Sequence, residues 1–154
     1  MIPLALPSKP HSALARQLRV IYDRAAQFPL SVLQALARLA VGAVFFKSGL
    51  TKIANWDLTV MLFADEYAVP LLSPEIAAAL ATTAELVCPA LLVLGLAARL
   101  ATLPLLAMTF VIQAFVYPEN WAEHLTWTTL LLLILARGAG LMSIDHLVRT
   151  ALGR

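Results

Sequence analysis

The sequence predicts an all-α integral membrane protein, a transmembrane four-helix up-down bundle with an N-terminal amphipathic helix at the membrane surface. Three observations support this fold class. The chain of 154 residues is 61% hydrophobic and only 13% charged. Its mean hydropathy is +0.84, and its apolar residues gather in long runs separated by links. A soluble domain of this length has too much surface to be so apolar.

The apolar runs have lengths that suit membrane spans, which need about 17 to 25 residues. The predicted spans cover residues 31–50, 76–96, 100–117 and 121–136, within a membrane domain over 31–137. Very short links join the second span to the third and the third to the fourth. Short links make neighbouring helices antiparallel, which predicts the up-down order.

The segments outside the spans have their own patterns. Residues 12–28, within an N-terminal segment over 1–30, predict a basic amphipathic helix that lies in the membrane interface. Its apolar side chains fall near one face: Leu14, Leu18, Ile21 and Phe28. The link over residues 55–72 is too apolar for a solvated loop and predicts a short interfacial or re-entrant helix. Residues 138–154 are expected to form a C-terminal tail.

The distribution of Lys and Arg predicts that both termini face the cytoplasm of a bacterial-type inner membrane. With four spans, the base-rich flanks all fall on one side: Lys9, Arg16, Arg19, Arg24, Arg99, Arg137, Arg149 and Arg154. The opposite flanks hold one base, Lys52, and five acids: Asp57, Asp65, Glu66, Glu75 and Glu119. This agreement supports the four-span interpretation.

Polar side chains inside the predicted spans are the candidate site, because ionisable groups in spans usually face the interior and pair. At a rise of about 1.5 Å per residue, Glu85 lies about 13 Å below the outer end of its span. Lys47 lies about 5 Å deep and Arg38 about 18 Å deep. Since Arg38 and Lys47 fall on nearly opposite helix faces, Glu85 is expected to pair with one of them. The sequence leaves open which one.

Two further polar residues, Gln113 and His124, lie near the outer ends of their spans, roughly level with Lys47. We therefore expect a polar pocket under aromatic cover in the outer half of the bundle. Its predicted residues are Lys47, Glu85, Gln113, His124, Trp121 and Trp127. Arg38 is expected to be a structural intramembrane charge.

Missing motifs exclude several function classes. The sequence has no Gly-rich phosphate loop, no GxSxG and no HExxH. It also has no basic patch with interleaved aromatics, so no nucleic-acid partner is expected. The single cysteine, Cys88, excludes an internal disulfide and is expected to pack in the core. No metal site is expected, because His124, Cys88 and Glu85 lack ligand spacing.

Four stretches together resemble the DoxX family of small four-helix membrane proteins: RLAVGAVFFKSGLTKI, TTAELVCPALLVLGLAAR, VIQAFVYPENWAEHLTW and GLMSIDHL. The resemblance runs from about Arg38 to Leu147. It implies four spans and, as characteristic polar positions, Arg38, Lys47, Glu85, Gln113 and His124. The family takes its name from a subunit of a thiosulfate:quinone oxidoreductase complex, and other relatives accompany redox, thiol-stress and sulfur-linked membrane systems.

Three functional hypotheses follow from these observations. The first is a redox-associated membrane subunit of a quinone-linked oxidoreductase, with a quinone-type pocket and a protein partner or a homo-oligomeric state. No cofactor is evident in the chain beyond this quinone-type ligand, since it shows no flavin, haem or iron–sulfur site, so two-electron chemistry would need a partner or an external reductant. The second is a translocator of a small solute or metal ion. The third is a membrane anchor or assembly partner of another enzyme system, in which the Glu85 pair only stabilises the bundle.

Overall fold

The computed structural model describes residues 13–153, and within them every regular element is helical. The prediction of an all-α protein is confirmed. Lys9, Arg154 and the start of the predicted amphipathic helix at Ser12 lie outside the described residues. The elements are α1 (Ala13–Ala26), α2 (Leu30–Ala54), α3 (Trp56–Leu62), the π-helical turn η1 (Phe63–Tyr67), α4 (Pro74–Leu94), α5 (Ala98–Val111), the π-helical turn η2 (Ile112–Val116), the 3-10 turn η3 (Pro118–Asn120), α6 (Trp121–Arg137) and α7 (Ile144–Ala151).

Three described helices are long and apolar enough to cross a membrane: Leu30–Ala54, Pro74–Leu94 and Ala98–Val116, the last formed by α5 together with η2. The fourth predicted span corresponds to α6, which has 17 residues. At 1.5 Å per residue α6 is about 26 Å long, a little shorter than the roughly 30 Å hydrocarbon core. The structure therefore supports a membrane protein with three clear spans and a shorter fourth apolar helix.

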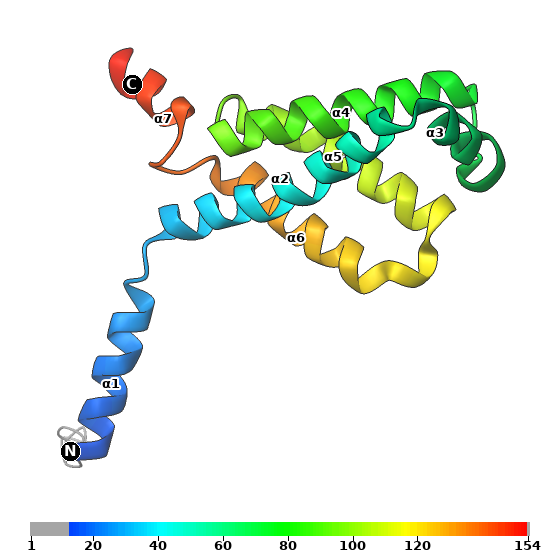
Figure 1. Cartoon of the computed structure of the whole chain (residues 1–154). Coiled ribbons are helices and arrows are strands. Elements are labelled where there is room, and N and C mark those ends of the chain that lie inside the picture. Colours follow the sequence, from blue (N-terminus) through cyan, green and yellow to red (C-terminus); the bar gives the residue numbers. More distant parts are fainter. Residues whose placement is uncertain (1–12, 154) are drawn as a thin grey trace, which may run out of the picture.

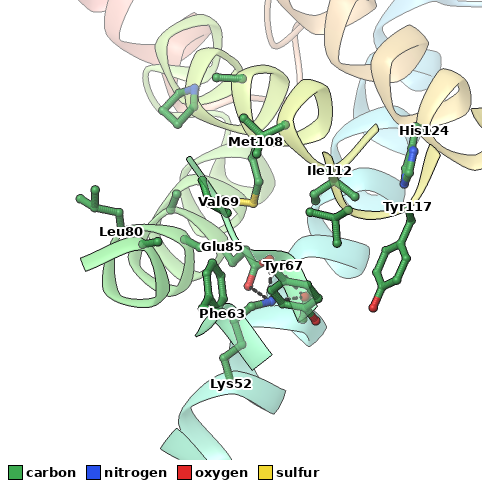
Figure 2. A pocket seen from close by; sticks show the side chains of 18 of the residues that line it. Lys52, Phe63, Tyr67, Val69, Leu80, Glu85, Met108, Ile112, Tyr117 and His124 are labelled. Carbon is green, nitrogen blue, oxygen red and sulfur yellow. Dashed lines mark hydrogen bonds and ion pairs between the residues drawn. The ribbon is translucent and has the colours of Figure 1, made fainter. Parts of the chain in front are cut away.

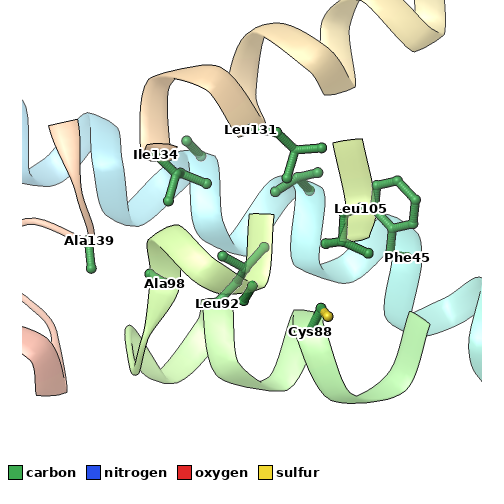
Figure 3. Close-up of a cluster of buried hydrophobic side chains, with 11 residues drawn as sticks. Phe45, Cys88, Leu92, Ala98, Leu105, Leu131, Ile134 and Ala139 are labelled. Carbon is green, nitrogen blue, oxygen red and sulfur yellow. The ribbon is translucent and has the colours of Figure 1, made fainter. Parts of the chain in front are cut away.

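The four long helices contact one another in a ring, because α2 packs against α4 and α6, and α5 packs against the same two helices (Figure 1). We call the end that carries α3, η1 and η3 the outer end, and the end that carries the α4–α5 turn and α7 the inner end. Side chains from all four helices fill the inner half, and Figure 3 shows Phe45, Leu92, Leu105 and Leu131 among them. Cys88 is buried in the same cluster, as the sequence predicted.

Glycines on α2 allow α4 to approach closely. A Cβ atom on Gly49 would lie 2.8 Å from Cδ2 of Leu86, and one on Gly42 would lie 3.1 Å from Cγ2 of Val93. Both glycines share the buried face of α2 with Arg38 and Phe45. Small residues at such positions let helix backbones pack closely in membranes.

At the inner end, the segment after α6 folds back onto the bundle. Nε2 of Gln34 donates to the carbonyls of Arg137 and Gly138, at 3.0 and 2.9 Å. Nη2 of Arg38 donates to the carbonyl of Met142 at 2.6 Å. The Asp145 carboxylate accepts from the backbone N–H groups of Ala97, the residue before α5, and of Ala98, its first residue. The tail is thus fastened to the bundle by polar contacts along its first residues.

Helix α1 buries no residue, and Figure 1 shows it projecting away from the four packed helices. Its apolar side chains remain exposed, among them Leu14, Leu18 and Ile21. A helix with one apolar and one basic face that buries none of its residues is typical of helices that lie in a membrane interface.

The long outer link is helical, as predicted, and it packs on α4. Asn55 ends α2 and caps α3 by accepting from the N–H of Leu58. Phe63 of η1 is buried against Ala77 and Ala78 of α4. The link therefore forms a wall at the outer end, beside the place where the predicted site residues lie.

Candidate functional site

A cavity of about 660 Å³ occupies the outer half of the bundle. Every long helix of the ring and both π-helical turns contribute to its wall, which is mostly apolar (Figure 2). Its polar lining includes Ser48 and Lys52 of α2, Glu85 of α4, and His124 of α6. A cavity of this size, mostly apolar with a few polar groups, has the character of a site for a small organic ligand.

A buried ion pair is the strongest electrostatic feature of this cavity. Nζ of Lys52 lies 2.7 Å from Oε2 of Glu85 and donates to Oε1 at 2.9 Å. The hydroxyl of Ser48 accepts from Lys52 at 2.9 Å and donates to Oε1 of Glu85 at 3.1 Å. The side chains of Lys52 and Glu85 are only 16% and 4% exposed. Each charge is therefore neutralised where water is scarce.

The prediction that Glu85 pairs with Arg38 or Lys47 was wrong. The sequence pattern placed Lys52 in the outer flank, whereas α2 continues to Ala54 and keeps Lys52 inside the bundle. Lys52 continues the buried stripe of Arg38, Gly42, Phe45 and Gly49, because it stands three residues after Gly49. Extending that stripe by one step would have identified Lys52 as the partner.

Lys47, which was predicted to line the pocket, lies outside the cavity, and the lysine that lines it is Lys52. Lys47 is exposed, nine residues from the buried Arg38 and therefore on the opposite face of α2. Its side chain makes no hydrogen bond or ion pair with any described residue.

The structure brings His124 of α6 into contact with Gln113 of η2. Nδ1 of His124 lies 2.7 Å from Oε1 of Gln113, and Nε2 of Gln113 donates to the carbonyl of Pro118 at 2.8 Å. His124 is buried at 4% exposure, and its ring lies 5.2 Å from that of Trp127. Both His124 and Trp127 line the cavity.

A second, smaller hollow of about 340 Å³ also has His124 in its wall. Gln113 and Trp121 line this hollow and not the larger one. Trp121 is 63% exposed. Of the six predicted pocket residues, Glu85, His124 and Trp127 therefore line the main cavity. Gln113 does not line it but contacts it indirectly, through its hydrogen bond with His124.

Aromatic side chains that the sequence did not assign to the site close its outer end. The Phe63 and Tyr67 rings of η1 lie 5.0 Å apart, and the Tyr67 ring lies 6.0 Å from that of Tyr117. The hydroxyl of Tyr117 donates to Oε1 of Glu66. This hydrogen bond raises the pKa of the Tyr117 phenol, so the group stays neutral.

Parts of the cavity wall reach the surface of the bundle. On α4 and α5 the exposed lining residues are Leu80, Pro104 and Ala107. Both helices are membrane-spanning candidates, so this surface faces lipid when they span a bilayer. At the outer end the exposed lining residues are Leu72, Tyr117, Asn120 and Glu123.

Arg38 lies at the inner end and does not line the cavity. It is buried and bonded to the carbonyl of Met142, while its Nε and Nη1 have no hydrogen-bond partner among the described residues. Its contacts fasten the tail, which fits the predicted structural charge. The described residues contain no group of three or more His, Cys, Asp or Glu side chains that could hold a metal ion.

The sequence was compared with known proteins, solved structures and family models. No curated protein matches the chain, and no solved structure matches it. The DoxX family model matches residues 33–118, which is more than half of the chain and runs from α2 into η3. The matched part includes Lys52, Glu85 and Gln113 and ends before His124. The chain therefore belongs to the DoxX family.

Proposed function

We propose that this protein is a redox-associated membrane subunit that binds a quinone-type ligand in the outer cavity. The observation that carries the proposal is the composition of that cavity. About 660 Å³ of mostly apolar space surrounds a buried lysine–glutamate pair and a histidine. A quinone needs an apolar slot for its ring and tail, and hydrogen-bonding groups for its two oxygens. The exposed wall residues on α4 and α5 suit a ligand that enters from the bilayer.

The side chains have distinct roles in this proposal. Lys52 provides a cationic donor for one ligand oxygen, and Glu85 and Ser48 hold its ammonium group in place. Trp127 and Tyr67 supply aromatic surfaces beside the ring. The protein binds and positions the ligand, and a partner protein with its own redox centre supplies or takes the electrons.

The proposed topology adds a fourth span to the three clear ones. We infer that α6 crosses the membrane as a fourth span, so that both termini lie in the cytoplasm of a bacterial-type inner membrane. Arg99, Arg137 and Arg149 then share the cytoplasmic side, while Asp57, Asp65 and Glu119 share the other. A cysteine-labelling experiment at positions 65 and 149 tests this arrangement, since only the former should react in intact cells.

A translocator is the second hypothesis, because a charged pair in a span can mark a permeation route. Below the cavity, however, the inner half is filled by the close-packed cluster that includes Leu92, Leu105 and Leu131. A pathway through one chain would have to cross that cluster. Flux into proteoliposomes that disappears in Glu85→Gln would support translocation over ligand binding.

The proposal is tested by measuring the quinone that co-purifies with the protein in mild detergent, by extraction and mass spectrometry. We expect near-stoichiometric quinone in the native protein and almost none in the double variant Lys52→Met/Glu85→Met. Both charges are removed together because replacing a whole buried pair by apolar residues leaves a fold intact more often than removing one partner.

Lys47→Met is the matched control, since it removes the same side chain from the opposite face of the same helix. It should keep its quinone. Absence of quinone from the well-folded native protein, or unchanged quinone in the double variant, would contradict the proposed function.

A further inference from the structure

The orientation of the Gln113 side-chain amide is fixed by its two hydrogen bonds. Its NH₂ group donates to the carbonyl of Pro118 at 2.8 Å, and its oxygen faces Nδ1 of His124 at 2.7 Å. A reversed amide would place its oxygen against the carbonyl oxygen of Pro118, where neither atom can donate. Gln113 therefore presents an acceptor, and only an acceptor, to His124.

This acceptor fixes the tautomer of His124. Because the Gln113 oxygen cannot donate, Nδ1 of His124 carries the proton that joins them. In a neutral imidazole one ring nitrogen donates and the other accepts, so Nε2 presents a lone pair. Nε2 makes no hydrogen bond within the described part of the chain, although the ring is 4% exposed and lines the cavity.

The cavity thus offers two different partners to a ligand. Around Lys52 it presents a cationic donor. His124 lines both this cavity and the smaller hollow, and Figure 2 shows Lys52 and His124 on separate parts of the wall. A carbonyl oxygen suits Lys52 but not His124, because two lone pairs would face each other there. A hydroxyl group suits His124, because its hydrogen can reach Nε2.

We propose that the cavity recognises a ligand hydroxyl through Nε2 of His124, with Gln113 as the positioning residue that fixes the tautomer. This inference rests on the proposed function and sharpens it: the reduced, quinol form of the ligand binds more tightly than the oxidised form. One good neutral hydrogen bond, against an unfavourable contact in the oxidised form, gives a preference of about tenfold.

The first measurement reads the tautomer directly. The purified full chain is labelled with ¹⁵N-histidine, and its spectrum in detergent is recorded at about pH 8, where imidazoles are mostly neutral. The chain has three histidines, so His124→Asn assigns the signal of interest. We expect protonated Nδ1 and unprotonated Nε2. A proton on Nε2 would overturn the inference.

The second measurement compares affinities for a short-chain benzoquinol, kept reduced under argon, and for the corresponding benzoquinone. The native protein should prefer the quinol by about tenfold. In Gln113→Leu the tautomer is no longer fixed, so the preference should fall toward one while both forms still bind. Phe115→Leu is the matched control, because Phe115 stands in the same π-helical turn, is exposed and lines neither hollow.

The outcomes separate this inference from the proposed function. Equal affinity for both forms in the native protein, or an unchanged preference in Gln113→Leu, overturns the role of His124 and Gln113 while quinone binding stands. Failure of both probes to bind the well-folded native protein overturns the proposed function and the inference together. A preference for quinol that disappears in Gln113→Leu and persists in Phe115→Leu supports both.

Discussion

The inner and outer halves of the bundle are built from the same four helices, yet they use buried polar residues in opposite ways. In the inner half, Gln34 and Arg38 donate to backbone carbonyls of the tail, and a close-packed apolar cluster fills the remaining space. In the outer half, Lys52, Glu85 and His124 line a cavity. The polar groups of the inner half are occupied by backbone carbonyls and fasten the fold, whereas those of the outer half face a cavity in which a ligand could contact them.

The largest expected effect of a single substitution is in the outer half. Lys52→Met leaves the Glu85 carboxylate buried without its cation and should lower the free energy of unfolding by about 3–5 kcal/mol. Lys52→Met/Glu85→Met should recover most of this loss. Thermal unfolding in detergent, followed by circular dichroism, measures both variants. A single variant as stable as the native protein would show that the pair contributes little.

The next largest effect is expected in the inner half, where Leu92 is fully buried in the apolar cluster. Leu92→Ala should cost about 2–5 kcal/mol, because it removes buried methyl groups and leaves a cavity. The same unfolding experiment measures this loss. If the two halves are separate in function, the variant should still bind quinone below its unfolding temperature. Loss of binding in the folded variant would show that the halves are coupled.

Gly95→Ala should cost about 2 kcal/mol or more and loosen the tail. Gly95 has φ +66°, which an alanine adopts with strain, and a Cβ atom there would lie 2.0 Å from Nη1 of Arg38. Arg38 must then move away from the carbonyl of Met142. Limited proteolysis should cut the segment after Gly138 faster in the variant, and unchanged cleavage would argue against this fastening.

The smallest effect is expected at the aromatic cover. Tyr117→Phe removes the hydrogen bond to Glu66 and should cost about 0.5–1 kcal/mol. Because this bond raises the pKa of Tyr117, the bond stabilises the fold fully below the ordinary tyrosine pKa of about 10 and is progressively lost as pH rises above it. The native protein should therefore lose more stability than Tyr117→Phe on going from neutral to strongly alkaline pH. Parallel curves for the two proteins would contradict this role.

Much of the fold followed from the sequence, because apolar runs of this length have few alternatives to helices in a membrane protein. The buried stripe of Arg38, Gly42, Phe45 and Gly49 was also readable, since helical periodicity places these residues on one face. The predicted span over residues 121–136 agrees with α6, Trp121–Arg137, to within one residue, whereas the first span was predicted to end at residue 50 and α2 continues to Ala54. Helix ends depend on local capping, which periodicity does not report.

The site was only partly predictable. Glu85 and His124 stood out as polar residues within apolar runs, and both line the cavity. Lys47 stood out for the same reason and lies outside it, because depth along a helix says nothing about which face a side chain occupies. Tyr67 and Phe63 could not be placed from sequence, since the path of the outer link depends on its packing against α4.

The central claim is that a quinone-type ligand occupies the outer cavity, and the most direct measurement uses the tryptophans as position markers. Of Trp56, Trp121 and Trp127, only Trp127 lines the cavity. A short-chain quinone is titrated into Trp56→Phe/Trp121→Phe, which retains Trp127, and into Trp56→Phe/Trp127→Phe, which retains the exposed Trp121. We predict saturable fluorescence quenching in the first protein and only weak, linear quenching in the second. Equal, unsaturable quenching in both would contradict the account.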